Sequence, residues 1–273
     1  MHVKNARSRM NFLFRKLKEE FDLKDPRTMA YINMFGVLGT LENLCEMDNK
    51  AKEIIAGIKP VSVAFEVKDG PSATFHFTNK GCRMVQGVDQ CDVKLPFSSC
   101  EKFNGLIEGT VTPIPSKGFT KIGFLLKKFT PLTNRLSEVM RPSEEALKDE
   151  RMLELNTKLM LNTICASIAA VGNYDEIGMA SASYMVDGDV QMAIKNSLKV
   201  TVRVKNHHLT AIKSEQPNPR AVMQFDSIKL ANDLFNGRVN ALACIGEGTI
   251  EMHGFISLID NLNRILDRVS MFF

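Results

Sequence analysis

Apolar positions recur with a helical period near the start of the chain. In residues 8–22 they form one stripe, and most of the charged residues lie outside it. The stripe consists of Met10, Leu13, Phe14, Leu17 and Phe21. This pattern predicts an amphipathic helix that either packs on its own domain or lies on an anionic membrane or in a partner groove. A second helical segment is predicted from 28 to 56, ending near Gly57.

The period then changes to two, which is typical of β-strands. Residues 61–67, 72–78, 82–87 and 91–97 alternate apolar with polar side chains and are rich in Val, Phe and Thr. Turn residues separate the first three runs. We therefore expect an antiparallel meander of four strands.

Helical periodicity returns at Ser98, which together with Glu101 suggests a capping box. Gly109 would end this helix. After an extended stretch with prolines at 113 and 115, residues 119–140 are strongly apolar and helical, with a predicted break at Pro131.

The remainder of the chain repeats this order. Residues 144–171 are predicted to be helical, and strands follow between 181 and 225. Asp226 is the predicted cap of a short helix that Gly237 closes, and residues 255–273 form an apolar terminal helix.

Two pairs of segments match in sequence as well as in order. FSSCEKFNGLIEGTVTPIP (97–115) and FDSIKLANDLFNGRVNALA (225–243) share residues at six positions, 128 apart. TFHFTNK (74–80) aligns with TVRVKNH (201–207) at an offset of 127. We therefore expect an N-terminal helix over 1–27 and two similar domains, 28–141 and 142–273, each with a leading helix.

Composition narrows the function classes. The chain has 273 residues, 44% hydrophobic and 24% charged, which is ordinary for a globular protein. A net charge of +4, no Trp and three Tyr disfavour nucleic-acid binding. No secretory signal and no run able to cross a bilayer is evident. The six Cys form no CxxC pair, so we expect reduced thiols in a cytoplasmic protein.

No motif for catalysis, a cofactor or a metal is present in the sequence. It contains no phosphate loop, dinucleotide fingerprint or nucleophile elbow. His76 has no evident carboxylate partner, and His207 and His208 lie at a predicted hairpin tip. We predict no catalytic residue, no cofactor and no metal ligand.

The order of elements, and above all residues 225–255, resembles the sterol carrier protein type 2 family of small lipid-transfer domains. The resemblance covers about residues 61–140 and 175–273 and carries no catalytic signature. It implies an α+β fold of two similar domains, each an antiparallel-rich sheet covered by helices. It departs from the family at prolines 113 and 115, in the helical leaders, and in the SMFF ending, which is not a peroxisomal address.

The fold and the 15 Met residues, whose side chains adapt to irregular apolar shapes, favour an internal cavity for an apolar ligand. We expect fatty-acyl, other lipid or sterol-like ligands to be bound or transferred without catalysis. The predicted lining is Phe103, Leu106, Ile107, Phe124, Leu125, Phe129, Leu230, Leu234, Phe235, Met252, Phe255, Ile259 and Leu262. The alternative for each of these residues, which the general packing of apolar helix faces favours, is plain core.

Two alternatives stay open. In the first, side chains fill both cavities and the chain is a scaffold or accessory oligomerisation subunit, which the apolar Met271, Phe272 and Phe273 favour. In the second, the chain presents a lipid to a partner enzyme. The partners to consider are therefore the apolar ligand, a second copy of the chain in a homodimer, and a membrane surface contacted by residues 8–22.

Overall fold

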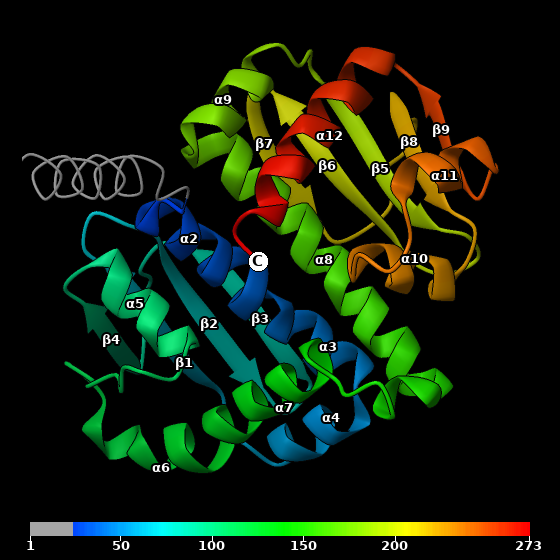
Figure 1. Cartoon of the computed structure of the whole chain (residues 1–273). Helices are drawn as coiled ribbons and strands as arrows, with labels where there is room; N and C mark the ends of the chain where they lie inside the picture. Colours follow the sequence, from blue (N-terminus) through cyan, green and yellow to red (C-terminus); the bar gives the residue numbers. More distant parts are fainter. Residues whose placement is uncertain (1–23) are drawn as a thin grey trace, which may run out of the picture.

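The protein is described for residues 24–273 by a computed structural model, in which two mixed β-sheets are each covered by helices (Figure 1). The predicted α+β class is confirmed. The predicted helix over residues 8–22 lies outside the described part of the chain. Within residues 24–273, no helix combines the length and hydropathy needed to cross a bilayer.

The first half of the described chain, residues 24–141, contains one four-stranded sheet. Its elements are α2 (Pro26–Tyr31), η1 (Ile32–Val37), η2 (Leu38–Thr40), α3 (Leu41–Met47), α4 (Asn49–Ile55), β1 (Val61–Val67), β2 (Ser72–Thr78), β3 (Gly81–Gln86), β4 (Val93–Phe97), α5 (Cys100–Ile107), η3 (Phe119–Lys121), α6 (Ile122–Phe124), η4 (Leu125–Phe129) and α7 (Thr130–Met140).

The strand order of this sheet is β3-β2-β1-β4. β1, β2 and β3 pair antiparallel, but β4 lies parallel to β1, with Val93 opposite Val63. The predicted meander is therefore wrong in its last strand. Periodicity identifies a strand but not its neighbour, and here β4 pairs with β1, so that β1 and β2 are the two inner strands.

The second half, residues 142–273, contains a five-stranded sheet. Its elements are η5 (Ala146–Lys148), α8 (Glu150–Tyr174), α9 (Glu176–Ser183), β5 (Gly188–Ile194), β6 (Lys199–Lys205), β7 (His208–Ile212), β8 (Ala221–Phe225), α10 (Ile228–Phe235), α11 (Ala241–Gly246), β9 (Ile250–Gly254) and α12 (Ile256–Ser270). The strand order is β7-β6-β5-β8-β9, with β8 parallel to β5.

The two sheets share their register as well as their order. Val63 of β1 and Val190 of β5 are 127 positions apart and hold the same place, because they lie opposite Phe75 and Val202, which are also 127 apart. β4 and β8 likewise pair in the same register with β1 and β5, at an offset of 128. Each core-facing residue of β1 to β4 therefore has a counterpart in β5 to β8.

The fifth strand, β9, is the main difference between the sheets. The N–H of Asp226 donates to the carbonyl of Thr249, so Gln224, two residues earlier, points its N–H toward β9 as well. Pro96 occupies the matching position in β4 and has no N–H to donate. This proline explains why β4 remains an edge strand.

The short helices α5 and α10 begin with matching caps. The side chains of Ser99 and Ser227 each accept a hydrogen bond from the N–H three residues on. Both caps lie one residue after the predicted Ser98 and Asp226, which corrects both predictions. Asp226 instead pairs with Lys195 at 2.8 Å.

The predicted break at Pro131 is also wrong, since η3, α6, η4 and α7 follow one another without interruption. Pro131 is the second residue of α7, so its missing N–H falls inside a continuous helical stretch. The π-helical turn η4 precedes it, and the hydroxyl of Thr130 donates to the carbonyl of Leu125 at 3.0 Å. A side-chain hydrogen bond thus replaces a backbone hydrogen bond that the π-helical turn disturbs.

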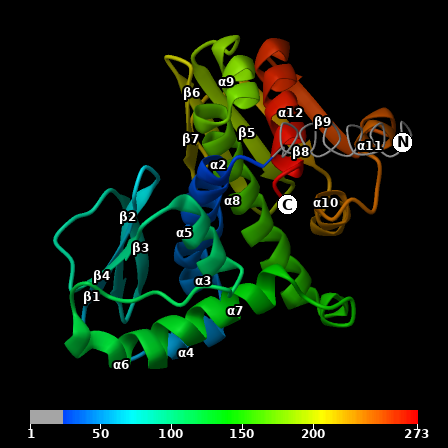
Figure 2. The same ribbon diagram turned by 60° about the vertical axis from the view of Figure 1, so that its left-hand side comes forward.

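The two halves meet through their leading helices, since α8 packs against η1 and α2 (Figure 2). The crossing is close at Gly36, where an added Cβ would lie 3.0 Å from Oγ of Ser167. Thr163 donates to the carbonyl of Gly36 at 3.4 Å, and the rings of Tyr31 and Tyr174 stack with centroids 3.5 Å apart. Each half therefore turns its helical side toward the other.

Candidate functional site

Phenylalanine rings fill the space between the first sheet and its helices. The rings are those of Phe65, Phe75, Phe77, Phe97, Phe103, Phe124 and Phe129. Neighbouring centroids lie between 5.2 and 6.5 Å apart, in the range of favourable aromatic contacts. We call this set the ring cluster.

The six lining residues predicted in the first half all lie in or against this packed interior. Phe103 is fully buried. Leu106, Ile107, Phe124, Leu125 and Phe129 are half-buried and pack against the same core. They are brought together by α5 and by the helical stretch from α6 to α7.

The second half has smaller side chains at the matching places. Met192, Val202, Val204 and Ala231 stand where the first half has Phe65, Phe75, Phe77 and Phe103. Phe225 matches Phe97 and is the ring that both halves have in common. The interior of the second half is therefore lined mainly by thioether and branched aliphatic groups, with the Phe225–Phe235 ring contact at 5.3 Å and the buried ring of Phe272.

The seven lining residues predicted in the second half differ in exposure. Ile259 and Leu262 of α12 are buried in the core. Leu230, Leu234, Phe235 and Met252 are half-buried at its margin. Phe255 lies outside the cluster, 41% exposed, with the Arg220 guanidinium 4.9 Å from its ring centre.

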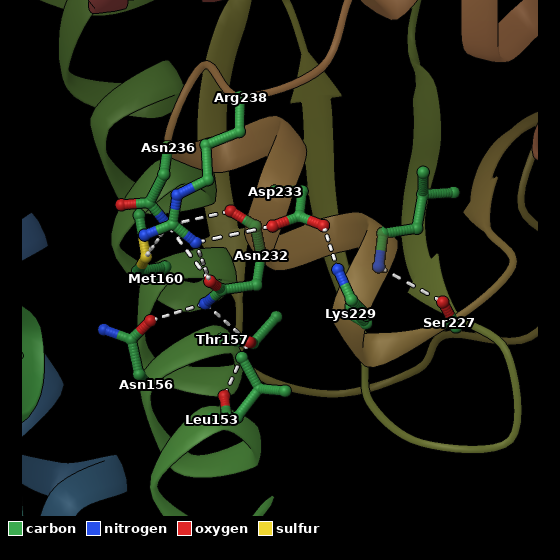
Figure 3. Close-up of polar contacts among 11 residues, drawn as sticks. Leu153, Asn156, Thr157, Met160, Ser227, Lys229, Asn232, Asp233, Asn236 and Arg238 are labelled. Atoms are coloured by element: carbon green, nitrogen blue, oxygen red, sulfur yellow. Dashed lines mark hydrogen bonds and ion pairs between the residues drawn. The ribbon is translucent and has the colours of Figure 1, made fainter. Parts of the chain in front are cut away.

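A polar contact fixes α10 on α8 beside this margin (Figure 3). Asn232 is fully buried, and its Nδ2 donates to Oδ1 of Asn156 at 2.6 Å and to Oγ1 of Thr157 at 2.9 Å. In the first half Asn104 holds the matching place and accepts from Nδ2 of Asn33 at 3.0 Å. In each half, a buried asparagine thus ties the short helix to the leading helix.

Surface charges flank the same contact in the second half. Hydrogen bonds from Lys229 at 2.7 Å and from Arg238 at 3.4 Å lower the pKa of Asp233 (Figure 3). The carboxylate therefore stays ionised and paired at the outer face of α10. Nothing in this arrangement places a proton donor or a nucleophile beside the apolar interior.

A buried ion pair occurs once in each half, at matching places. Asp48 caps α4 and Asp175 caps α9. Arg135 of α7 donates to Asp48 at 2.8 and 3.0 Å, and Arg268 of α12 donates to Asp175 at 3.0 and 2.7 Å. Burial opposes ionisation of Asp48, but the hydrogen bonds outweigh it and lower its pKa. The first pair holds α7 against α4, and the second pair holds α12 against α9.

The thiols are placed as core residues. All six Cys are free, and burial raises the pKa of Cys45 to about 12 and raises that of Cys165 as well. A thiol with a raised pKa is a weak nucleophile. Over residues 24–273, no cluster of three or more His, Cys, Asp or Glu side chains is arranged to hold a metal ion.

An open cleft of about 770 Å³ lies in the first half and reaches the ring cluster at Phe97 alone. It is lined by Glu66, Val67, Lys68, Pro96, Phe97, Ser98, Lys102, Val111, Thr112, Pro113 and Ile114. None of the predicted lining residues borders it. It lies beside the edge of β4, and the departure of prolines 113 and 115 from the family pattern is the sequence signal that marks this region.

Comparisons with known proteins give matches at the level of structure. No protein-family profile matches the sequence, and neither does any curated protein. A UbiJ-SCP2 ubiquinone synthesis protein is 14% identical with a TM-score of 0.33, covering 41% of this chain and 97% of that chain. The sterol carrier protein domain 2 of Helicoverpa armigera is 16% identical with a TM-score of 0.34, covering 42% and 89%. Palmitated SCP2L2 from Aedes aegypti is 17% identical with a TM-score of 0.29, covering 39% and 90%.

Proposed function

We propose that the chain is a non-catalytic lipid-binding protein of two sterol-carrier-like domains, 28–141 and 142–273, in which the second domain holds an apolar ligand. A fatty-acyl chain is the ligand class that this interior suits best. The six free, mostly buried thiols are compatible with a cytoplasmic location.

The difference between the two interiors carries this proposal. Four phenylalanine rings of the first half are replaced in the second by Met192, Val202, Val204 and Ala231. An aromatic ring occupies much more volume than a valine or alanine side chain, and it bends less readily than a methionine. The second interior can therefore exchange side-chain contacts for ligand contacts, whereas the ring cluster cannot do so without losing its aromatic packing.

The half-buried margin of the second interior provides a route for the ligand. Leu230, Leu234 and Phe235 of α10 and Met252 of β9 separate the buried core from solvent. Displacing these flexible side chains exposes Phe225, Ile259 and the core behind them. Since each methylene transferred from water contributes about 0.8 kcal/mol, about ten methylenes supply roughly 8 kcal/mol, enough for micromolar binding before the ordering cost.

Of Met271, Phe272 and Phe273, the three residues that favour the scaffold alternative, one does not support it. Phe272 is buried, with the Arg268 guanidinium 5.2 Å from its ring centre, so the terminal aromatic tip is not wholly exposed. Met271 and Phe273 remain 48% and 63% exposed. A homodimer through this end therefore stays a prediction.

Displacement of a fluorescent fatty acid tests ligand binding and its location together. Leu234→Gln places an amide at the margin of the second interior, and we expect about a tenfold loss of affinity as roughly 1.5 kcal/mol of apolar contact is removed. Leu106, 128 positions earlier, holds the matching place in the first half, so Leu106→Gln is the control and should leave affinity unchanged. Absence of fatty-acid binding by the unaltered chain would refute the proposal.

A further inference from the structure

The helical stretch from Phe119 to Phe129 has apolar side chains on both sides. Phe124, Leu125 and Phe129 pack against the first core. Exposed on the surface of the same stretch are Phe119, Ile122 and Leu126, whose exposed fractions are 61%, 38% and 66%. Their spacing of three and four residues puts them on one helical face. The stretch is therefore fixed on one side and carries an uncovered apolar stripe on the other.

Basic side chains border this stripe. Lys117, Lys121, Lys127 and Lys128 fall within twelve residues, and the sequence contains no Asp or Glu from 109 to 137. Within residues 24–273, no carboxylate forms an ion pair with Lys127 or Lys128.

The first two lysines are partly engaged by neighbouring groups. Lys117 donates to the carbonyl of Cys91 at 2.6 Å. Asp92 lies near Lys117 and Lys121, and hydrogen bonds from Ser62 together with these lysines lower the pKa of its carboxyl group. The uncompensated positive charge of the stretch is therefore concentrated at Lys127 and Lys128, next to the exposed Leu126.

The position of the stripe leaves it accessible. α6 lies at the end of the first half that points away from the second half, in both views (Figures 1 and 2). Ile114, on the loop just before the stretch, is a further apolar side chain and is 75% exposed. The stripe thus lies on the part of the first half that faces away from the second half.

We infer that this stripe, Phe119, Ile122 and Leu126 with its lysine border, docks on an anionic lipid bilayer. Apolar side chains that project between lysines can enter the acyl region while the ammonium groups reach lipid phosphates. The charge complementarity selects an anionic bilayer, because about 1 kcal/mol per lysine is gained near such a surface. The inference does not depend on ligand binding by the second half, and it concerns a different segment from residues 8–22.

A single tryptophan introduced into the stripe reports its insertion, since the chain has no Trp of its own. Phe119→Trp and, separately, Leu126→Trp should each show blue-shifted emission and quenching by brominated lipid when the full chain is mixed with phosphatidylcholine–phosphatidylglycerol vesicles. Tyr184→Trp, at a 74% exposed site in the second half, is the matched control and should show neither. If both stripe reporters stay unshifted, the inference is wrong, even if the chain sediments with vesicles through another segment.

The charge requirement is tested separately. Lys127→Gln combined with Lys128→Gln should lower the vesicle partition coefficient by about fivefold for each lysine. Lys50→Gln combined with Lys52→Gln, on α4, is the control and should change it little. Equal insertion into pure phosphatidylcholine vesicles, or equal loss with both double variants, would overturn the assignment to an anionic surface.

Discussion

The two halves of this protein have sheets of the same strand order and register but fill their interiors differently. In the first half, the ring of Phe65 contacts those of Phe75 and Phe103 within a continuous aromatic cluster. In the second half, the matching residues are Val202 and Ala231, and half-buried side chains of α10 border the core. One backbone plan can therefore support a closed interior or an adaptable one, depending on a few side-chain volumes.

Two features common to both halves indicate what the shared plan requires. Each half has a buried Asp–Arg pair, which joins α4 to α7 in the first half and α9 to α12 in the second. Each also has a buried asparagine that ties a short helix to a leading helix. Since these polar contacts occur in both halves while the core volumes differ, we attribute the contacts to the shared fold, and the difference in volume supports the proposed ligand binding by the second half.

The largest expected effect comes from the buried ion pairs. Asp48→Ala and Asp175→Ala each remove the carboxylate that holds a buried arginine by two hydrogen bonds, so each should lower the free energy of unfolding by about 3 to 5 kcal/mol. Urea denaturation followed by circular dichroism measures this loss. Asp226→Ala removes a surface pair with Lys195 and should cost less than about 1 kcal/mol. A large loss in one half and none in the other would contradict a common role.

The lowered pKa of Asp48 gives the same pair a pH dependence. Its contribution to stability is complete above the unfolded-state pKa of about 3.9 and is lost as the pH falls through the lower folded-state value. The unfolding free energy of Asp48→Asn should therefore fall less steeply than that of the unaltered chain below about pH 4. If the unfolding free energies of the two chains fall equally steeply below about pH 4, Asp48 does not cause this pH dependence.

The next largest effect is expected from exchanging the side chains of Phe103 and Ala231, which hold matching places in the two halves. Phe103→Ala should cost about 3 to 5 kcal/mol through the cavity that it leaves in the ring cluster. Ala231→Phe should cost about 1 to 3 kcal/mol by overpacking and should also abolish the thermal stabilisation that added fatty acid gives the unaltered chain. If the Ala231→Phe chain is still stabilised by fatty acid, the second interior is not the binding site.

The smallest expected effect concerns the asparagines. Asn232→Ala removes the amide that donates to Oδ1 of Asn156 and to Oγ1 of Thr157, and it should cost about 1 to 3 kcal/mol by urea denaturation. Asn104→Ala should give a loss of similar size in the first half, because Asn33 then loses its partner. Unequal losses would show that α5 and α10 are held by different means.

Much of the fold follows from the sequence, because strand and helix periods and the repeat offset are local or pairwise patterns. The matching places of Val63 and Val190, 127 positions apart, agree with the offset seen in TFHFTNK and TVRVKNH. The sequence could not show that β4 lies beside β1, since a strand's alternation is the same whichever neighbour it has. The caps at Ser99 and Ser227 were misplaced by one residue because neighbouring polar residues offer similar side-chain oxygens.

The candidate site could be predicted from the sequence less completely than the fold. All thirteen predicted lining residues are apolar, and the apolar pattern alone does not separate Phe103, fully buried in rings, from Leu234, half-buried at a margin. The contrast between Phe75 and Val202 is present in the sequence, but it becomes meaningful only once the register shows that they hold the same place. The cleft beside Phe97 depends on how the loop at 111–114 folds back, which no local pattern encodes.

Native mass spectrometry of the full chain, loaded with fatty acid and freed of excess, tests the central claim most directly because it counts ligands per chain. We expect one acyl-chain adduct on the unaltered protein and none when Ala231→Phe is combined with Val202→Phe. Two adducts on the unaltered chain would mean that the ring cluster also opens, and a chain without any adduct would contradict ligand binding altogether.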